Sequence, residues 1–280
     1  MNTIILNSNN IINTGNNQFR YTFPTSKNLN SHQIALASIQ LFYSWFNITA
    51  SNANNIFQYR WFDNVTYTVT IPDGFYTVAQ LSAYLQSVMI SRTHYLVNSS
   101  TRTNVYFLEL VTNPTLYSCQ INAYPLSQAQ ATTNTWALPS GSTWNIPAQE
   151  SIPTIIILNN NFKKVLGINE GSYPVVANVT TTQVYSKTSD FCPQVTPINS
   201  LMMTCSLVNS PYGNPTNVIY SFAPEVQFGS LISYQINEFA WVDVTSGTHN
   251  EIVLSIVDQN LQPVTIIDPS IVITLLIKPK

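Results

Sequence analysis

Alternating apolar and polar residues at both ends of the chain constrain the fold more than any other feature of the sequence. In QFRYTFP (residues 18–24), three aromatic residues alternate with Arg20 and Thr22. In SIVITLLIK (residues 270–278), four aliphatic side chains fall on one face. A period of two is typical of a β-strand with one buried face. We expect the last strand to be paired and covered, because an exposed apolar edge strand invites aggregation.

Strand signals recur along most of the sequence. Residues 33–47 are apolar on both faces, as in a central strand, with a bend expected near Ser38. The pair Asp63-Asn64 separates two runs of aromatic and β-branched residues, which predicts a hairpin, and the triplet TNP (112–114) predicts another. Beyond residue 201, short runs return about every 8 to 12 residues, which is typical of an antiparallel sandwich or barrel.

One helix interrupts the strands, in IPDGFYTVAQLSAYLQSVM. Thr77 is suited to the N-cap and Gln80 completes a capping box, so the sequence predicts a short capped helix over about 77–90. Its apolar stripe contains Val78, Leu81, Leu85 and Val88. We expect this stripe to cover an open end of the β domain. A membrane surface or a partner groove is the alternative, which the absence of Lys and Arg from the polar face disfavours.

The middle of the chain has weaker patterns. Residues 127–153 are polar, contain prolines and carry Trp136 and Trp144 without periodicity, which predicts a long loop. A single helical turn is predicted before Gly167. We therefore expect one domain over 1–280, a mainly β antiparallel sandwich, with a loop-rich insertion or apical region over 127–200.

The surface of the folded chain is expected to be polar but nearly uncharged. Charged residues make up 8% of the sequence, and 10 Lys and Arg against 12 Asp and Glu leave a net charge of −2. Ordinary domains carry about 25% charged residues. Association with further copies therefore meets little electrostatic repulsion, which favours a protein that assembles.

The three cysteines favour a protein of a reducing compartment. Cys119, Cys192 and Cys205 are odd in number and lack CxxC spacing, which favours free thiols, with a Cys192–Cys205 disulfide as the alternative. The sequence shows no signal or transit peptide pattern. No stretch reaches the roughly 18 apolar residues that a membrane span needs, so none is expected.

No motif for catalysis or ligand binding is recognisable in the sequence. His32, His94 and His249 are scattered without metal-ligand spacing. The segment LPSGSTW is not a nucleophile elbow, and the 8 glycines form no phosphate-binding loop. Lys163-Lys164 is the one basic pair, which argues against direct nucleic-acid binding. The sequence thus predicts no catalytic residue, no cofactor and no metal.

Several stretches, taken together, resemble the penton (minor capsid, vertex) proteins of virophages and Polinton-type viruses. The resemblance covers most of the chain outside 127–160. The stretches are FRYTFP, IALASIQLFYSWFNI, IPDGFYTVAQLSAYLQ, VYFLEL, FKKVLGINEGSYP and EIVLSIVDQNLQPVTIIDPSIVITLLIK. They are structural rather than catalytic signatures.

The resemblance implies a single upright jelly roll with an inserted or apical region, and five copies that form the capsomer at each icosahedral vertex. It implies a homopentamer that contacts the major capsid protein, resides in the virion, is assembled in the host cell cytoplasm and is not an enzyme. No long extra domain is recognisable in this sequence. Trp136 and Trp144 are the candidate contacts of the apical surface.

Three alternatives remain at this point. The first is a receptor- or glycan-binding, lectin-like sandwich with Trp136 and Trp144 as its platform. The second is a β-sandwich hydrolase or a processing protease of the virion, which the lack of a nucleophile with base and orienter disfavours. The third is a major capsid protein of another oligomeric state, for which 280 residues is short.

Overall fold

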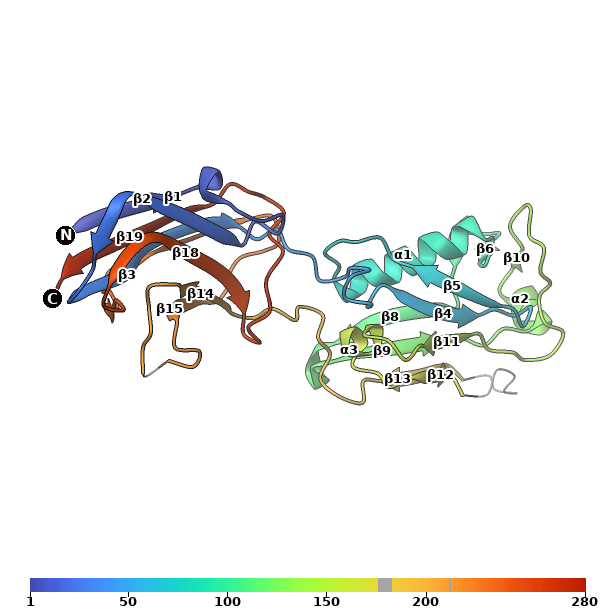
Figure 1. The fold of residues 1–280 in the computed structure, drawn as a ribbon. Helices are drawn as coiled ribbons and strands as arrows, with labels where there is room; N and C mark the ends of the chain where they lie inside the picture. The colour runs from blue at the N-terminus through green and yellow to red at the C-terminus, as the bar shows by residue number, and fades with distance from the viewer. Residues whose placement is uncertain (176–182, 212) are drawn as a thin grey trace. The chain divides into compact units, whose positions relative to one another are not determined.

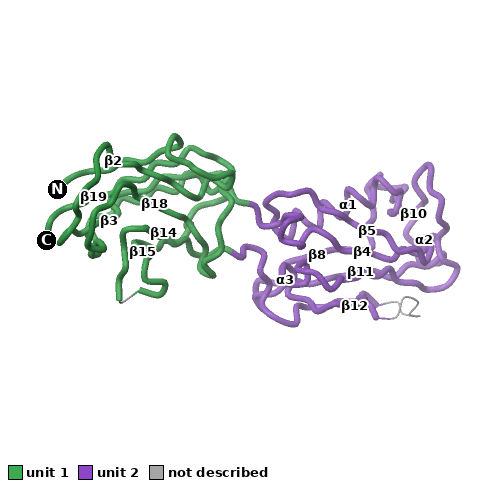
Figure 2. The backbone as a smooth tube through the Cα atoms, in the orientation of Figure 1, with its two compact units in different colours: residues 1–45, 198–280 green, residues 46–197 purple. Residues whose placement is uncertain are grey.

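The computed structural model describes residues 1–175, 183–211 and 213–280, and the chain is mainly antiparallel β (Figure 1). The predicted fold class is confirmed at this level. The chain forms two compact units, which we call unit 1 (1–45 and 198–280) and unit 2 (46–197) (Figure 2).

Unit 1 contains two antiparallel sheets. In the first sheet, the order is β1 (Asn2–Leu6), β19 (Val272–Pro279), β3 (His32–Phe42) and β16 (Leu231–Gln235), and β17 (Val242–Asp243) also pairs with β3. In the second sheet, the order is β15 (Val218–Phe222), β14 (Leu201–Cys205), β18 (Thr248–Asp258) and β2 (Gln18–Asn28). Each sheet therefore joins strands that are distant in the sequence.

The core of unit 1 follows the predicted alternation. On β19, Ile273, Leu275 and Ile277 are buried, and on β18 every second residue from Ile252 to Asp258 is buried. Each sheet thus has one apolar face, which is the requirement for a two-layer sandwich. The apolar strand near the end of the sequence lies between β1 and β3, so the expectation that it is paired and covered is confirmed.

Two irregularities in unit 1 lie close to residues that the sequence marked. Along β3, Ser38 pairs with Thr274 but Leu36 pairs with Leu275, which leaves Ala37 as a bulge and confirms the bend near Ser38. Pro24 does not end its strand, since β2 runs on to Asn28. Pro24 instead lies where the register with β18 is interrupted, since proline has no N–H to donate.

Unit 2 contains three smaller antiparallel sheets. Their strand orders are β12 (Gly171–Tyr173), β11 (Thr154–Ile157), β4 (Ile56–Arg60), β5 (Thr66–Thr70); then β13 (Tyr185–Thr188), β9 (Ser118–Ala123), β8 (Leu108–Asn113); then β10 (Trp136–Ala137), β6 (Leu96–Asn98), β7 (Asn104–Val105). Both predicted hairpins, β4–β5 and β8–β9, are confirmed. The β8–β9 turn includes the 3-10 helix η2 (Pro114–Leu116), and a second one, η1 (Ser8–Asn10), follows β1 in unit 1.

Three α-helices lie in the described part of unit 2: α1 (Val78–Ser91), α2 (Gln128–Thr133) and α3 (Phe162–Leu166). Helix α3 ends at Gly167, which has φ +68°, as the sequence predicted. Helix α2 and strand β10 replace part of the loop expected over 127–153. Ser127 caps α2 by accepting a hydrogen bond from the Gln130 N–H, but the sequence QAQATT has no large apolar residue and so gives no apolar period from which to predict a helix.

Unit 2 covers residues 46–197, and the loop-rich or apical region expected over 127–200 stays a prediction. Unit 2 begins at residue 46, because the first hairpin and α1 share a hydrophobic core with the segments that follow them. The insertion is therefore a compact unit, where the sequence showed no long extra domain. Whether the whole of 1–280 folds as a single domain stays a prediction.

The predicted capped helix is present as α1, in unit 2. Thr77 and Gln80 form the predicted capping box of α1. Within unit 2, the helix packs on β8. Val78, Leu81 and Leu85 of the predicted stripe are buried, and Ser82 and Met89 are buried with them.

Candidate functional site

The three histidines lie apart from one another in their hydrogen bonding. No group of three or more His, Cys, Asp or Glu in the described residues could hold a metal ion. The ring nitrogens of His32 and His249 hydrogen-bond to the carbonyls of Asn30 and Thr245 at 2.8 Å, close by in sequence. None of the helices in the described ranges is long and apolar enough to cross a membrane.

The two tryptophans proposed as surface contacts lie in unit 2. The Trp144 side chain is 3% exposed, and its Nε1–H donates to the Thr93 carbonyl at 2.7 Å. Trp136 on β10 is half-buried and packs edge-to-face on Phe107, with 5.8 Å between ring centroids. The buried indole of Trp144 is therefore a core group in this fold, and a surface role remains a prediction for Trp136.

All three cysteines are free thiols, so the alternative Cys192–Cys205 disulfide is absent. Cys119 and Cys205 are buried, and burial raises the pKa of each thiol to about 11. These two thiols are therefore protonated and unreactive near neutral pH. Cys192 is exposed.

His94 occupies an aromatic environment that the sequence did not indicate. The Tyr59 hydroxyl lies 2.8 Å from its Nδ1, and the Trp61 ring stacks on the imidazole at 5.0 Å with a 9° angle between planes. The side chain is 3% exposed, and burial lowers its pKa to about 4, with Arg92 also lowering it and Asp63 opposing. His94 is therefore neutral at physiological pH.

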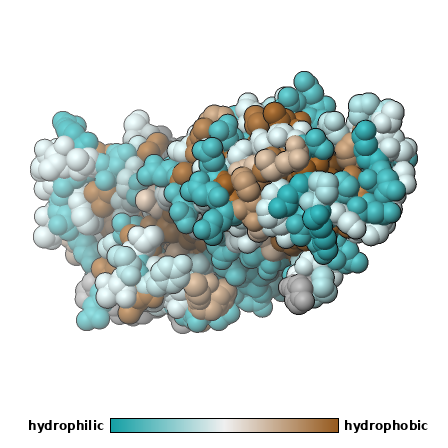
Figure 3. All heavy atoms as spheres, turned by 90° about the vertical axis from the view of Figure 1, so that its left-hand side faces the viewer, coloured by the Kyte–Doolittle hydropathy of each residue, from teal (hydrophilic) through white to brown (hydrophobic). Residues whose placement is uncertain are grey.

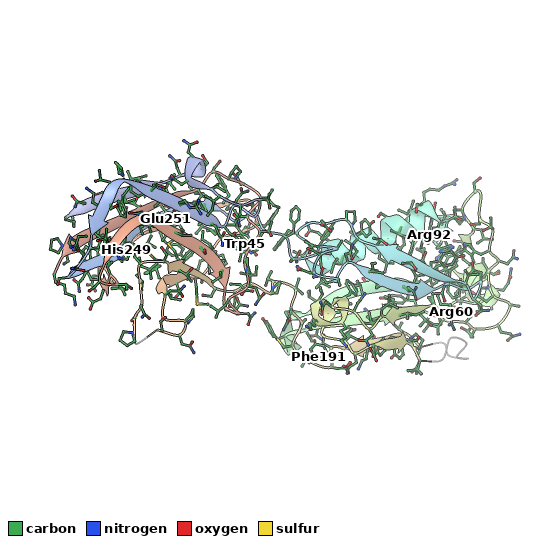
Figure 4. All side chains as sticks on the ribbon, viewed as in Figure 1. Trp45, Arg60, Arg92, Phe191, His249 and Glu251 are labelled. Carbon is green, nitrogen blue, oxygen red and sulfur yellow. The ribbon has the colours of Figure 1, made fainter. Side chains whose placement is uncertain are left out.

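Arg92, at the C-terminal end of α1, links the helix to β4 and β5 (Figure 4). Its Nη2 donates to the Thr68 carbonyl at 2.9 Å, and its Nη1 donates to the Tyr59 hydroxyl at 3.3 Å. The guanidinium carbon lies 5.7 Å and 5.2 Å from the ring centroids of Tyr59 and Tyr67, within cation–π range. Arg92 therefore has a structural role, since it joins the end of α1 to β4 and β5.

Helix α1 satisfies the free backbone groups of two edge strands. The Ser82 hydroxyl accepts a hydrogen bond from the Leu110 N–H of β8 at 3.0 Å. The Tyr84 hydroxyl donates to the Thr70 carbonyl of β5 at 2.8 Å, next to the Arg92 contact with Thr68. Edge strands with unpaired groups are sites of unwanted strand pairing, so α1 protects two such edges of unit 2.

The surface carries few charges and scattered apolar side chains. In the space-filling view, brown apolar residues lie among teal and white ones on the face that is drawn (Figure 3). Large hydrophobic residues exposed by 37% or more include Met1, Ile5, Ile12, Phe228, Leu231, Phe239, Leu261, Ile267 and Val272 in unit 1 and Val65, Ile90, Leu116, Tyr117, Val175, Val184 and Phe191 in unit 2. Single exposed apolar residues are normal, so only their grouping is informative.

The outer face of the first sheet in unit 1 groups several of these residues. Ile5 lies beside Thr274, and Val272 lies beside Gln40, in a register where Gln40 faces Ser233. Strands β1, β3 and β16 contain no Lys, Arg, Asp or Glu. Around Ile5, Val272 and Gln40 this face carries aliphatic, hydroxyl and amide side chains, whereas Lys278 of β19 and Asp243 of β17 lie beside Gln33.

Two solved structures are similar to the whole chain. A selenomethionine-labelled mavirus penton protein matches at 9% identity with a TM-score of 0.45, over 100% of this chain and 98% of that one. The Sputnik virophage structure determined by cryo-EM at 3.5 Å matches at 12% identity with a TM-score of 0.36, over 99% and 97%. No family model and no curated protein matches the sequence.

The sequence predicted the helix cap and the hairpins of unit 2, but not the contacts of His94 with Tyr59 and Trp61. His94 follows α1 and has no partner at a recognisable spacing, because Tyr59 on β4 and Trp61 just after it lie more than thirty positions earlier. Ser82 interrupts the apolar stripe next to Leu81, and that position could have marked it as a buried hydrogen-bonding residue.

Proposed function

We propose that the chain is a structural protein of a virus particle, specifically a penton protein. Five copies form a capsomer at the icosahedral vertex and contact the neighbouring major capsid protein. The proposal includes assembly in the host cell cytoplasm, no enzymatic activity and no direct binding of nucleic acid.

The strand order of unit 1 is the observation that carries this proposal. With β17 counted beside β16, the first strand pairs with the last, β1 with β19, and the second pairs with the last but one, β2 with β18. Strands β3 and β16 complete the first sheet of four, and β14 and β15 complete the second. Nested pairing of this kind supports a single jelly roll, an architecture found in viral capsid domains.

The position of unit 2 supports the same proposal. The chain leaves the sandwich after β3 and returns before β14, so unit 2 is an insertion with its own core. The family that the sequence stretches resemble has an inserted or apical region. An insertion with its own packed core can display a rigid surface without disturbing the sandwich strands.

The low surface charge suits a ring of identical subunits. A five-fold ring needs a head-to-tail contact in which each copy offers two different patches. Each contact should bury more than about 1,000 Å² to be stable. A net charge of −2 per chain leaves little repulsion among five copies.

The oligomeric state of the purified full-length chain tests the proposal. Native mass spectrometry should detect a species of five times the 31.3 kDa chain mass, and electron microscopy should show five-fold rings. A stable trimer would indicate a major capsid protein instead. A chain that stays monomeric at high concentration and in the presence of its capsid partner would contradict the proposal.

The glycan-binding alternative is weaker on this structure than on the sequence. It needed both tryptophans at the surface, and the Trp144 side chain is 3% exposed. A glycan array should therefore give no signal that depends on Trp136. Binding that Trp136→Ala abolishes while the oligomer persists would favour the lectin-like function.

A further inference from the structure

Several edge strands of this protein are covered. Helix α1 supplies Ser82 to the edge of β8 and Tyr84 to the edge of β5. On the edge of β2, the Asn10 side chain donates to the Arg20 carbonyl at 2.9 Å, and the Ile12 N–H donates to the Gln18 carbonyl at 3.1 Å. Such coverage is how natural proteins prevent unplanned strand pairing.

Strand β1 is an edge strand without these devices. It pairs with β19 in a continuous register from Asn2 opposite Ile277 to Leu6 opposite Ile273. Its sequence, NTIIL, has no charge and no proline, and the pairing has no bulge. On the side away from β19, none of its backbone groups hydrogen-bonds to any residue that the structure describes.

The side chains beside this edge are apolar and exposed. Ile5 is 59% exposed and points to the outer face of the sheet, while Ile4 and Leu6 are buried. Val272, on the neighbouring strand, is 38% exposed. Polar residues usually occupy the outer face of such an edge, so Ile5 leaves apolar area next to unpaired backbone groups.

We propose that β1 pairs antiparallel with β1 of a second copy of this chain, centred on Ile4, so that the first sheets of two copies become continuous. Thr3 of each copy then lies opposite Ile5 of the other, and no charged residues meet across the junction. The strand is its own complement, since antiparallel pairing presents the same donors and acceptors from both sides.

This contact is distinct from the one in the proposed ring. A strand that pairs with its own copy makes a two-fold contact, whereas five copies in a ring use a head-to-tail contact. The β1 pairing would therefore join two chains, or two capsomers, and does not depend on the penton proposal.

The first test compares the association of the full-length chain with that of Ile5→Lys. Lysine at this exposed position leaves the fold intact but places two positive charges across the junction. Sedimentation velocity of the parent chain should show a species of twice the basic assembly, dimer or paired ring, and Ile5→Lys should weaken it at least about tenfold. Leu116→Lys, at a 63% exposed position in unit 2, is the matched control and should change nothing.

A cross-linking test keeps the proposal falsifiable if Ile5→Lys folds poorly. Both variants carry Cys192→Ser to remove the exposed native thiol. A mixture of Thr3→Cys and Ile5→Cys chains should form a disulfide-linked dimer, because opposed residues in an antiparallel pair bring their Cβ atoms to about 5 Å. Either variant alone should cross-link far less.

Three results would overturn the proposal. They are the absence of a doubled species at any concentration, a doubled species that Ile5→Lys leaves unchanged, and cross-linking of the mixture no better than of either variant alone. Loss of the doubled species with intact five-fold rings would support the β1 contact and the penton proposal separately. Doubling of a monomer would support the β1 contact and contradict the ring.

Discussion

His94 couples the stability of unit 2 to pH. Its pKa is about 4 in the folded chain against an ordinary 6.5, so the unfolded chain binds more protons between these values. The part of the unfolding free energy that depends on a neutral His94 is fully present above pH 6.5 and is lost as the pH falls toward 4. The loss amounts to about 2–3 kcal/mol of unfolding free energy, at 1.36 kcal/mol per unit.

Urea titrations at pH 7 and pH 4.5 test this coupling. The chain should lose stability between the two, and His94→Gln should flatten the difference by about 2 kcal/mol while lowering stability at pH 7. His32→Gln is the control, because its ring bonds within its own loop. An unchanged pH dependence in His94→Gln would show that carboxylates, not His94, carry the effect.

Position 167 requires glycine for two reasons, its positive φ angle and the close approach of Phe191. Its φ is +68°, and a Cβ there would collide with the Phe191 carbonyl oxygen. Gly167→Ala should therefore lower stability by about 1–3 kcal/mol, by strain and displacement together. Gly141 has φ +84° but no described atom within 4 Å of an added Cβ, so Gly141→Ala measures the backbone effect alone. Equal shifts in thermal midpoint for the two variants would contradict the role of the Phe191 contact.

At the scale of elements, α1 acts as the partner of two strand edges. Ser82→Ala should leave the buried Leu110 N–H without its acceptor and lower stability by about 1–3 kcal/mol. Amide hydrogen exchange should speed up at Leu110 in particular. The control is Ser87→Ala on the exposed side of the helix, whose hydroxyl donates to the Tyr84 carbonyl. Unchanged exchange at Leu110 would mean that packing alone protects this edge.

Elements with local signals could be predicted from the sequence, whereas their partners could not. The capping box at Thr77, the turn at Asp63-Asn64 and the Gly167 stop each depend on neighbours within a few residues. The division at residue 46 depends on which sheet each strand joins. The sequence does not indicate this, because strands of different units, such as β4 and β19, have similar alternating patterns. Trp144 seemed exposed because its loop is polar, but the Thr93 carbonyl and the core fix its indole through contacts distant in sequence.

At the scale of the whole molecule, unit 2 has the features of an independently folding body. Its apolar residues form one continuous cluster, and all its strands pair within it. A fragment of residues 46–197 should therefore fold alone and give a dispersed NMR spectrum with a cooperative thermal transition. Unit 1 without its insertion, with 45 and 198 joined by a short linker, is the complementary sample. A fragment without stable structure would favour one domain over 1–280.

The central place of β19 determines the order in which the protein can form during synthesis. Strands β1 and β3 leave the ribosome early, yet both pair with β19, which is translated after the whole of unit 2. Unit 2 can close as soon as its own strands have emerged. Until β19 emerges, the apolar strands β1 and β3 lack the partner that lies between them, while unit 2 is already folded. Translation of β19 is therefore the step that allows the sandwich to form.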